Sequence, residues 1–293
     1  MRLSADQVAR FREEGVVVVE GVVTDEDLAP VIAEYEAWID DRARQLHSEG
    51  KIQDLAEEAD FNHRFARLYA QSREMAKGLD IMEARGPAVF DFLRNPNLMD
   101  AVECLVGPEI TCSPIQHVRA KPPAALTGEE LGYYNIPWHQ DMAVTWVEAD
   151  HSEIVTCWVA LADATVENGC MQVLPRVWKG GYLEHHRGPG GTAVSPEAMP
   201  ETAPLPVPVR KGGAVFMHRC TPHGSTPNYS DGVRWSLDLR YQPTGTPTGR
   251  PFYPDFVTRS RAHPESVLTD HQEWSRRWVE ALENAKGVHA HRV

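Results

Sequence analysis

The chain has 293 residues, of which 42% are hydrophobic, and its 42 acidic against 29 basic residues give a formal charge of −13. This length suits one large domain or two small ones, and the apolar fraction is ample for a core. The acidic balance argues against nucleic acid and anionic membranes as partners, because both require a basic surface.

The cysteine content and the N-terminus suggest a compartment. The five cysteines are odd in number and include no Cys-x-x-Cys pair, which argues against a disulfide framework or a zinc knuckle. The N-terminal residues lack the apolar core of a signal peptide, and no stretch approaches membrane-spanning length. We therefore expect a soluble, cytoplasmic protein.

The first third of the chain is predicted to be rich in helices. Ser4 before residues 6–14 and Gly15 after them indicate a short capped helix, and the valine run 16–19 indicates a strand. Thr24, with an acidic residue three positions later, forms a capping-box pattern that begins a second helix running to about Ala43. Residues 45–105 are predicted to be mostly helical or irregular, with a short helix at 97–106.

From residue 109 onward the pattern changes to short strands separated by Gly and Pro, which is typical of a sandwich or barrel. Residues 179–204 are predicted to be a long loop of a kind that often covers an active site. The segment 121–137 is predicted to be a second long loop, and a final amphipathic helix begins near residue 270. The candidate strands are 110–120, 154–161, 170–175, 206–209, 214–217 and 233–241.

The absence of repeats and linkers in the sequence favours a single domain over residues 1–293. Within it we expect a helix-rich part at about 1–108, a β core at about 109–245, and a C-terminal loop and helix at about 246–293.

A candidate metal site lies in the strand-rich part. His139-Gln-Asp141 follows a Pro-rich loop, and residues two apart in an extended segment point to the same side. A third ligand must come from elsewhere; His223, near the end of the predicted strand 214–217, is favoured, and His218 is the alternative. Two imidazoles and one carboxylate can bind Fe(II) on one face and leave the other face open for substrates.

The His-x-Asp triplet alone is a weak signal, because about one such triplet is expected by chance in a chain of this histidine content. Four His-x-Glu triplets compete with it. Three of them lie in charged helical or surface segments, and only the one at 151–153 lies close to the predicted barrel. The four begin at His47, His151, His263 and His271.

The predicted strand 233–241 alternates strictly between apolar and polar residues. An ordinary half-exposed strand would show the same alternation. However, Arg234 and Ser236, at the start of a strand expected to pair with the strand of His223, would form a compact clamp for a carboxylate. The polar face consists of Arg234, Ser236, Asp238 and Arg240.

Over nearly its whole length, the chain resembles the phytanoyl-CoA dioxygenase family of Fe(II)/2-oxoglutarate-dependent oxygenases. The resemblance implies a mainly β fold with flanking helices, namely a double-stranded β-helix (a cupin-like jelly-roll barrel) braced by the N-terminal helices. The segments that carry it are Phe11-Arg-Glu-Glu-Gly-Val-Val-Val-Val-Glu-Gly, Trp138-His-Gln-Asp, Trp158-Val-Ala-Leu-Ala-Asp-Ala-Thr-Val-Glu-Asn-Gly-Cys-Met, Lys211-Gly-Gly-Ala-Val-Phe, His223-Gly-Ser-x-Pro-Asn-x-Ser and Arg234-Trp-Ser.

The resemblance also implies roles for individual residues. His139, Asp141 and His223 match the iron ligands, Arg234 pairs with the distal carboxylate of 2-oxoglutarate, and Ser236 assists it. Four further residues match positions near the cosubstrate: Gln116, Lys121, Thr156 and Trp158. Trp178 stands where relatives commonly carry a histidine and is expected at the rim of the pocket. The candidate substrate contacts are Tyr133, Tyr134, Met142, Trp146, His186 and Arg187.

The implied reaction uses Fe(II), 2-oxoglutarate and O2 to hydroxylate an unactivated C–H bond of a small organic metabolite, with succinate and CO2 as coproducts. Related halogenases replace the carboxylate ligand by a small residue, so Asp141 favours hydroxylation or desaturation over halogenation. The alternatives are desaturation or another oxidative rearrangement at the same iron, or a catalytically silent jelly-roll binding protein.

Overall fold

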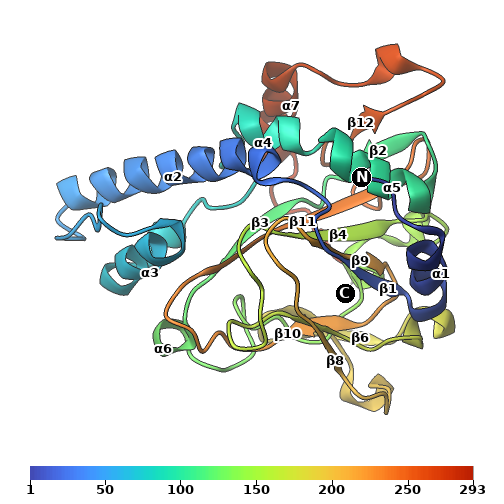
Figure 1. Ribbon diagram of the computed structural model, residues 1–293, viewed down its shortest axis with the longest axis horizontal. Coiled ribbons are helices and arrows are strands. Elements are labelled where there is room, and N and C mark those ends of the chain that lie inside the picture. Colours follow the sequence, from blue (N-terminus) through green and yellow to red (C-terminus); the bar gives the residue numbers. More distant parts are fainter. Residues whose placement is uncertain (293) are drawn as a thin grey trace.

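A computed structural model describes residues 1–292 of the chain and shows a mainly β fold with helices along one side (Figure 1). Among these residues, no helix is both long enough and apolar enough to cross a membrane. The α-helices are α1 (Ala5–Glu14), α2 (Asp25–Ser48), α3 (Phe61–Gln71), α4 (Pro87–Phe92), α5 (Pro96–Val106), α6 (Ala124–Thr127) and α7 (His271–Asn284).

The strands form three sheets. A seven-stranded sheet has the order β1-β9-β4-β11-β2-β12, with β3 also paired to β11; a three-stranded sheet has the order β10-β5-β8, and β6 pairs with β7. The strands are β1 (Val16–Val19), β2 (Ile110–Cys112), β3 (His117–Lys121), β4 (Val155–Ala160), β5 (Met171–Val173), β6 (His185–Gly188), β7 (Gly191–Val194), β8 (Leu205–Val207), β9 (Ala214–His218), β10 (His223–Ser225), β11 (Arg234–Pro243) and β12 (Phe256–Arg259).

Local chemistry sets the ends of the first helices as predicted. Ser4 and Gln7 form a capping box at the start of α1, and Thr24 and Asp27 form another at the start of α2. Gly15 ends α1 in the left-handed conformation with φ 77°, where a side chain would also collide with Trp178. Helix α2 extends five residues beyond the predicted end at Ala43, to Ser48.

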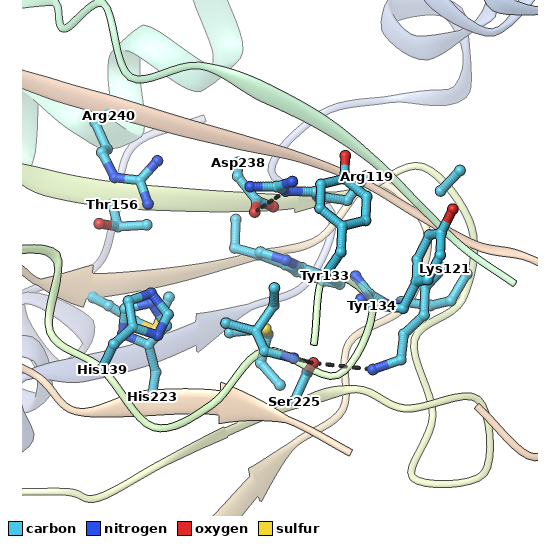
Figure 2. A pocket seen from close by; sticks show the side chains of 16 residues that line it. Arg119, Lys121, Tyr133, Tyr134, His139, Thr156, His223, Ser225, Asp238 and Arg240 are labelled. Atoms are coloured by element: carbon cyan, nitrogen blue, oxygen red, sulfur yellow. Dashed lines mark hydrogen bonds and ion pairs between the residues drawn. The ribbon is translucent and has the colours of Figure 1, made fainter. Parts of the chain in front are cut away.

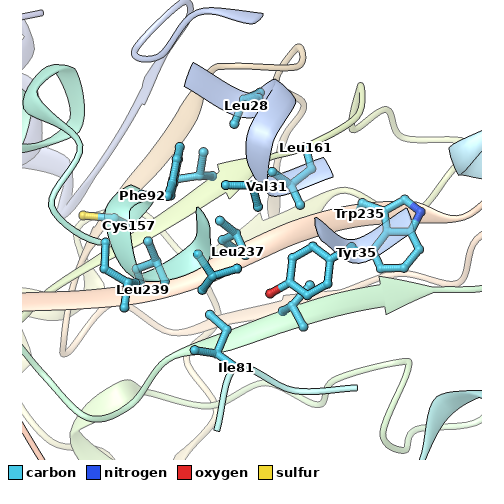
Figure 3. Packing of buried hydrophobic residues seen from close by; sticks show 14 of the residues in the cluster. Leu28, Val31, Tyr35, Ile81, Phe92, Cys157, Leu161, Trp235, Leu237 and Leu239 are labelled. Atoms are coloured by element: carbon cyan, nitrogen blue, oxygen red, sulfur yellow. The ribbon is translucent and has the colours of Figure 1, made fainter. Parts of the chain in front are cut away.

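The two faces of the seven-stranded sheet have different surroundings. On the inner face, toward the three-stranded sheet, Trp158 and Met217 pack with β5 and β8, and polar side chains border a cavity (Figure 2). On the outer face, Cys157, Leu237 and Leu239 pack against α2 and the segment around Ile81 (Figure 3). The alternation of β4 and β11 therefore separates a helix-covered core from the interior between the sheets.

The predicted strand at 110–120 was wrong as a single element. The structure has two strands, β2 and β3, separated by residues 113–116. Pro114 lies in this gap and has no backbone N–H to donate to a neighbouring strand, which accounts for the break.

The prediction of a loop throughout 179–204 was also wrong. Strands β6 and β7 form an antiparallel hairpin within it, with His185 paired to Val194 and Gly188 paired to Gly191. Each strand has only four residues, and the Gly-Pro-Gly-Gly connection made the whole segment look like a loop.

The predicted partner of the arginine strand needs correction. β11 pairs with β2, β3 and β4, whereas His223 lies on β10 in the three-stranded sheet. Because β11 and β10 belong to different sheets, Arg234 approaches the histidines across the interior and not along a shared ladder. Strand β12, which pairs with β2, was missed by the sequence analysis.

Candidate metal centre

His139 and His223 are brought together by the backbone. The two residues form an isolated antiparallel bridge, in which each N–H donates to the other's carbonyl, at 3.0 and 2.9 Å. Their rings lie 4.2 Å apart between centroids. Gln140 is extended, and Asp141 then begins a 3-10 helix, so the His-x-Asp segment is extended at the point where it was expected to be.

The side chains of His139, Asp141 and His223 converge on one point. The Nδ1 atoms of the two histidines bond to the carbonyls of Pro137 and Thr221, at 3.0 and 2.9 Å, so Nδ1 carries the proton and Nε2 is free to bind a metal. The two Nε2 atoms lie 3.9 and 4.0 Å from Asp141 Oδ1. One ligand atom from each residue lies within 4.8 Å of the others, which is the arrangement needed to hold one ion.

The competing ligands lie elsewhere. His218 packs its ring on Trp178, 4.4 Å away, and its Nδ1 accepts from the N–H of Cys220. Within residues 1–292, His139, Asp141 and His223 form the one group with metal-binding geometry, and none of the four His-x-Glu triplets does. Trp178 packs against His218 and Gly15 and lines neither cavity described below, so the expectation that it shapes the rim was wrong.

The Asp141 carboxylate is held by two neighbours that the sequence analysis did not assign to it. Arg240 donates from Nη2 to Oδ1 at 2.6 Å, and Thr156 donates to Oδ2. Burial alone would raise the pKa of Asp141, but Arg240 and the two imidazoles together hold it well below its usual range. Burial, reinforced by His223, lowers the pKa of His139 to about 3. His139 is therefore a neutral imidazole and Asp141 an ionised carboxylate, which are the forms that bind metal.

A buried cation lies deeper in the same interior. Arg234 is 4% exposed, donates from Nη1 to Ser236 Oγ at 3.0 Å, and stacks over the Trp158 ring at 4.8 Å. Its Nε has no hydrogen-bond partner among the described residues. Burial lowers its pKa to about 10, so it remains charged at neutral pH.

A buried lysine faces the same space. Lys121 is 2% exposed, and its Nζ donates to Ser225 Oγ at 2.9 Å (Figure 2). Burial and the nearby Arg234 lower the pKa of Lys121 to about 6. The charged Arg234 and the Lys121 amine share a cavity and lack a close carboxylate partner, so together they form a site suited to an anion.

These residues line one cavity that reaches from the metal centre to Lys121 (Figure 2). It contains six of the predicted site positions in addition to His139 and His223, whereas Gln116 turns away, its amide donating to the Ser113 carbonyl at 2.9 Å. The lining is Arg119, Ala120, Lys121, Tyr133, Tyr134, Ile136, His139, Thr156, Trp158, Met171, Met217, His223, Ser225, Arg234, Asp238 and Arg240.

Only some of the predicted substrate contacts line this cavity. Tyr133 and Tyr134 line this cavity, but Met142 contacts Cys220 and Trp146 packs on Phe252, and neither lines a cavity with the metal ligands. His186 is exposed on β6, and Arg187 lines a separate hollow beside the C-terminal residues.

Arg240 and Arg250 border the metal centre without having been predicted as site residues. Arg240 was placed on the polar face of its strand, which was the one available signal. Arg250 follows a Pro-, Gly- and Thr-rich stretch with no periodicity that would indicate its direction.

Comparison with known proteins relates the chain to one family, to a relative in that family and to two solved structures. A profile of the family described as phytanoyl-CoA dioxygenase (PhyH) matches residues 11–236. Peroxisomal phytanoyl-CoA dioxygenase of Bos taurus is 27% identical over 246 residues, covering 82% of this chain and 68% of that protein. The non-heme monooxygenase ThoJ superposes with a TM-score of 0.63 at 19% identity, covering 96% of this chain and 99% of the other.

The epimerase SnoN, solved with Fe3+, alpha-ketoglutarate and nogalamycin RO, has a TM-score of 0.54 at 22% identity. Its match covers 83% of this chain and 86% of that one. At these levels of identity, the two solved structures show a shared fold.

Proposed function

Because the chain belongs to the phytanoyl-CoA dioxygenase family, we propose that it is an Fe(II)/2-oxoglutarate-dependent dioxygenase that hydroxylates an unactivated C–H bond of a small organic metabolite. The observation that carries the proposal is the convergence of His139, Asp141 and His223 within 4.8 Å. It is supported by the buried, incompletely paired Arg234 in the same cavity. Two histidines and one carboxylate with open positions are the ligand set of non-haem iron oxygenases.

The position of each residue at the metal centre indicates its role. The Nε2 atoms of both histidines and the Asp141 carboxylate would hold Fe(II). Bound iron, with 2-oxoglutarate and O2, supplies the oxidation of an unactivated C–H bond and yields succinate and CO2. Arg240 keeps Asp141 ionised and fixes its direction, as hydrogen-bond partners of metal ligands commonly do.

The cosubstrate would lie in the cavity of Figure 2. Arg234 and Ser236 would bind its distal carboxylate with charge-assisted hydrogen bonds. Lys121 lines the same cavity, and its amine would donate a hydrogen bond to the bound anion. Trp158 and Met171 would exclude water on the opposite side.

The architecture is part of the same proposal. We assign the seven-stranded and three-stranded sheets to the two halves of a jelly-roll barrel, with residues 1–293 as one domain and the cytoplasm as its compartment. The centre lies between the two sheets, because His223 comes from β10 and Arg240 from β11.

The most specific part of the proposal is the type of oxidation, namely hydroxylation. The structures that share this fold include proteins named as a monooxygenase, an epimerase and a carbocyclase. Hydroxylation, desaturation and rearrangement are therefore distinguished by the mass of the product. Hydroxylation adds one oxygen atom, desaturation removes two hydrogens, and a rearrangement such as epimerisation leaves the mass unchanged.

The test of the enzymatic function is succinate formation in air by the purified protein with Fe(II) and 2-oxoglutarate. We expect a slow release without substrate that depends on both additions. It should be lost in His139→Ala, which removes a ligand, and retained in His218→Ala, which removes the rival histidine. Succinate release that is absent from the wild type, or equal in the wild type and His139→Ala, would refute the proposal.

A further inference from the structure

A second cavity adjoins the metal centre on the side away from Lys121. His139, Asp141 and Arg240 border it, and its volume is about 180 Å³. It shares His139 and Arg240 with the first cavity, so the candidate iron site lies between the two spaces. An apolar cavity of about 150 Å³ holds benzene in another protein, so this space suits one end of a small molecule.

Two of the three arginines that border this second cavity already have a carboxylate partner. His117 Nδ1 lies 2.8 Å from Asp80 Oδ2, and Arg119 Nε lies 3.6 Å from Asp238 Oδ2. Arg240 Nη2 forms an ion pair with Asp141 Oδ1 at 2.6 Å. These contacts occupy His117, Arg119 and Arg240, and they leave Arg250 and His291 to be accounted for.

Arg250 is buried without a counter-ion. It is 7% exposed, and its single side-chain hydrogen bond to residues 1–292 runs from Nε to the Val144 carbonyl at 2.8 Å. Its terminal nitrogens, Nη1 and Nη2, therefore have no partner among those residues. Burial and the neighbouring Arg240 lower its pKa to about 10, which leaves it charged at neutral pH. An unpaired guanidinium beside other cations is costly unless an anion joins it.

The backbone holds Arg250 in this place. Gly249 has φ +68°, and a side chain there would come within 2.6 Å of Thr145 Cβ. Its carbonyl accepts from the Trp146 N–H at 3.0 Å, and the Arg250 N–H donates to Thr248 Oγ1 at 3.2 Å. Arg250 is thus fixed on a segment packed against the residues that follow Asp141, as a preorganised binding residue should be.

The other residues that line the second cavity indicate what the rest of the ligand is like. Ile115, Ile136 and Val144 give the cavity an apolar wall. On another side, Thr192 Oγ1 and His291 Nδ1 are hydrogen-bonded at 2.7 Å. Burial lowers the pKa of His291 to about 4, so it is a neutral polar group at neutral pH. The cavity therefore combines one fixed cation with hydrocarbon-binding surface.

We infer that the substrate is a small carboxylic acid whose free carboxylate pairs with Arg250 while its hydrocarbon part lies against Ile115, Ile136 and Val144, next to the iron ligands. This inference rests on the proposed function and specifies its substrate class. The planar fork of a guanidinium matches a carboxylate with two parallel hydrogen bonds. An ester or thioester of the same acid lacks the charge that the site would neutralise.

The test compares short aliphatic and aromatic carboxylic acids, each with its own methyl ester, as stimulators of succinate release. Removing one charged partner of a hydrogen-bonded pair typically costs about 10- to 100-fold in binding. We expect the best acid to have a KM lower than that of its ester by this factor. Arg250→Ala should raise the KM for the acid by a similar factor and leave the KM for the ester nearly unchanged.

Two further variants separate a binding role from damage to the fold. Arg250→Lys keeps the charge and should recover part of the preference for the acid. Arg12→Ala removes an exposed arginine of α1 that lines neither cavity, and it should leave the KM unchanged. In every variant, the visible absorption of the anaerobic Fe(II)/2-oxoglutarate complex should persist, since none of them removes a ligand of the iron or of the cosubstrate.

The outcomes are distinguishable. If that absorption forms in the wild type but no acid is preferred over its ester, or Arg250→Ala keeps the preference, the inference is overturned while the proposed function stands. If the wild type forms no such complex and releases no succinate, both fall together.

Discussion

Both faces of β11 are buried, but one packs in an apolar core and the other borders the charged cavity. Trp235, Leu237 and Leu239 point outward (Figure 3), and together with Tyr241 they are fully buried in the core beneath the helices. Trp235 contacts Phe61 and Phe65 at ring distances of 4.5 and 5.4 Å. Arg234 and Arg240 point inward to the cavity, where Figure 2 shows Arg240, and Ser236 accepts a hydrogen bond from Arg234. All three are almost as deeply buried as the outward residues, but among charged groups.

The difference shows where stability and function separate on one strand. Removing apolar surface from water stabilises the outward face, whereas the inward face keeps a guanidinium Nε of Arg234 and of Arg240 without a partner. The outer face also holds an unpartnered polar atom, Trp235 Nε1, but that atom is uncharged. Buried charged groups lower stability more, and they are expected at functional sites. Substitutions on the outer face should therefore affect folding, and those on the inner face should affect binding.

The largest effect is expected on the outer face. Trp235→Ala should lower the free energy of unfolding by about 3–5 kcal/mol, because it leaves a cavity among packed aromatic rings. Tyr229→Ala, an aromatic residue with 59% exposure, should change it by no more than about 0.5 kcal/mol. Denaturant unfolding measures both, and equal losses would contradict the assignment of the core to this face.

The next effect is on cosubstrate binding. Arg234→Ala should weaken 2-oxoglutarate about 100-fold, since it removes a buried, charge-assisted clamp. Its melting temperature should fall much less than that of Trp235→Ala. Anaerobic spectral titration with 2-oxoglutarate gives the affinity, with Arg187→Ala as the unchanged control. An unaltered affinity in Arg234→Ala would place the cosubstrate elsewhere.

A smaller effect is expected from the neighbour of the metal ligand. Arg240→Met should lower the affinity for Fe(II) about 10-fold, because Asp141 loses its hydrogen-bond donor. Without Arg240, the pKa of Asp141 also rises, so iron binding should be lost at a higher pH as the solution is acidified. Iron titrations over a pH series measure both effects. An affinity equal to that of the wild type would show that Arg240 does not position Asp141.

The last prediction concerns Lys121 and the change of folding stability with pH. Its pKa is about 6 in the folded chain, against about 10.4 when unfolded, so the unfolded chain binds more protons between these values. The lysine therefore costs the fold most at about pH 6 and below, and this cost decreases as the pH rises. Relative to the wild type, Lys121→Met should gain about 1 kcal/mol for each unit of pH lowered toward 6. A difference that is independent of pH would contradict a neutral, buried lysine.

Sequence reasoning succeeded where the signal is local. Ser4 and Thr24 cap the helices as predicted, and the alternation of 233–241 placed Arg234 and Ser236 on the correct face. It failed where a partner lies far along the chain. The partner of β11 was misassigned, because alternation fixes the faces of a strand but not its neighbours.

Some residues of the site could be predicted from the sequence and others could not. The convergence of His139, Asp141 and His223 could be anticipated from ligand chemistry. The bond from Arg240 to Asp141 joins residues 99 positions apart, and no pattern near either one indicates it. Arg250 depends on the left-handed turn at Gly249, within a stretch whose composition predicts only a loop.

The most direct measurement is the visible spectrum of the wild-type protein, mixed with Fe(II) and 2-oxoglutarate without oxygen. A chelated ferrous centre built by His139, Asp141 and His223 should give a weak charge-transfer band that saturates at one iron per chain. The band should be absent in His139→Ala and unchanged in His218→Ala. A wild-type protein that forms no band, or a His139→Ala variant that forms the same one, would contradict the assignment of the metal centre.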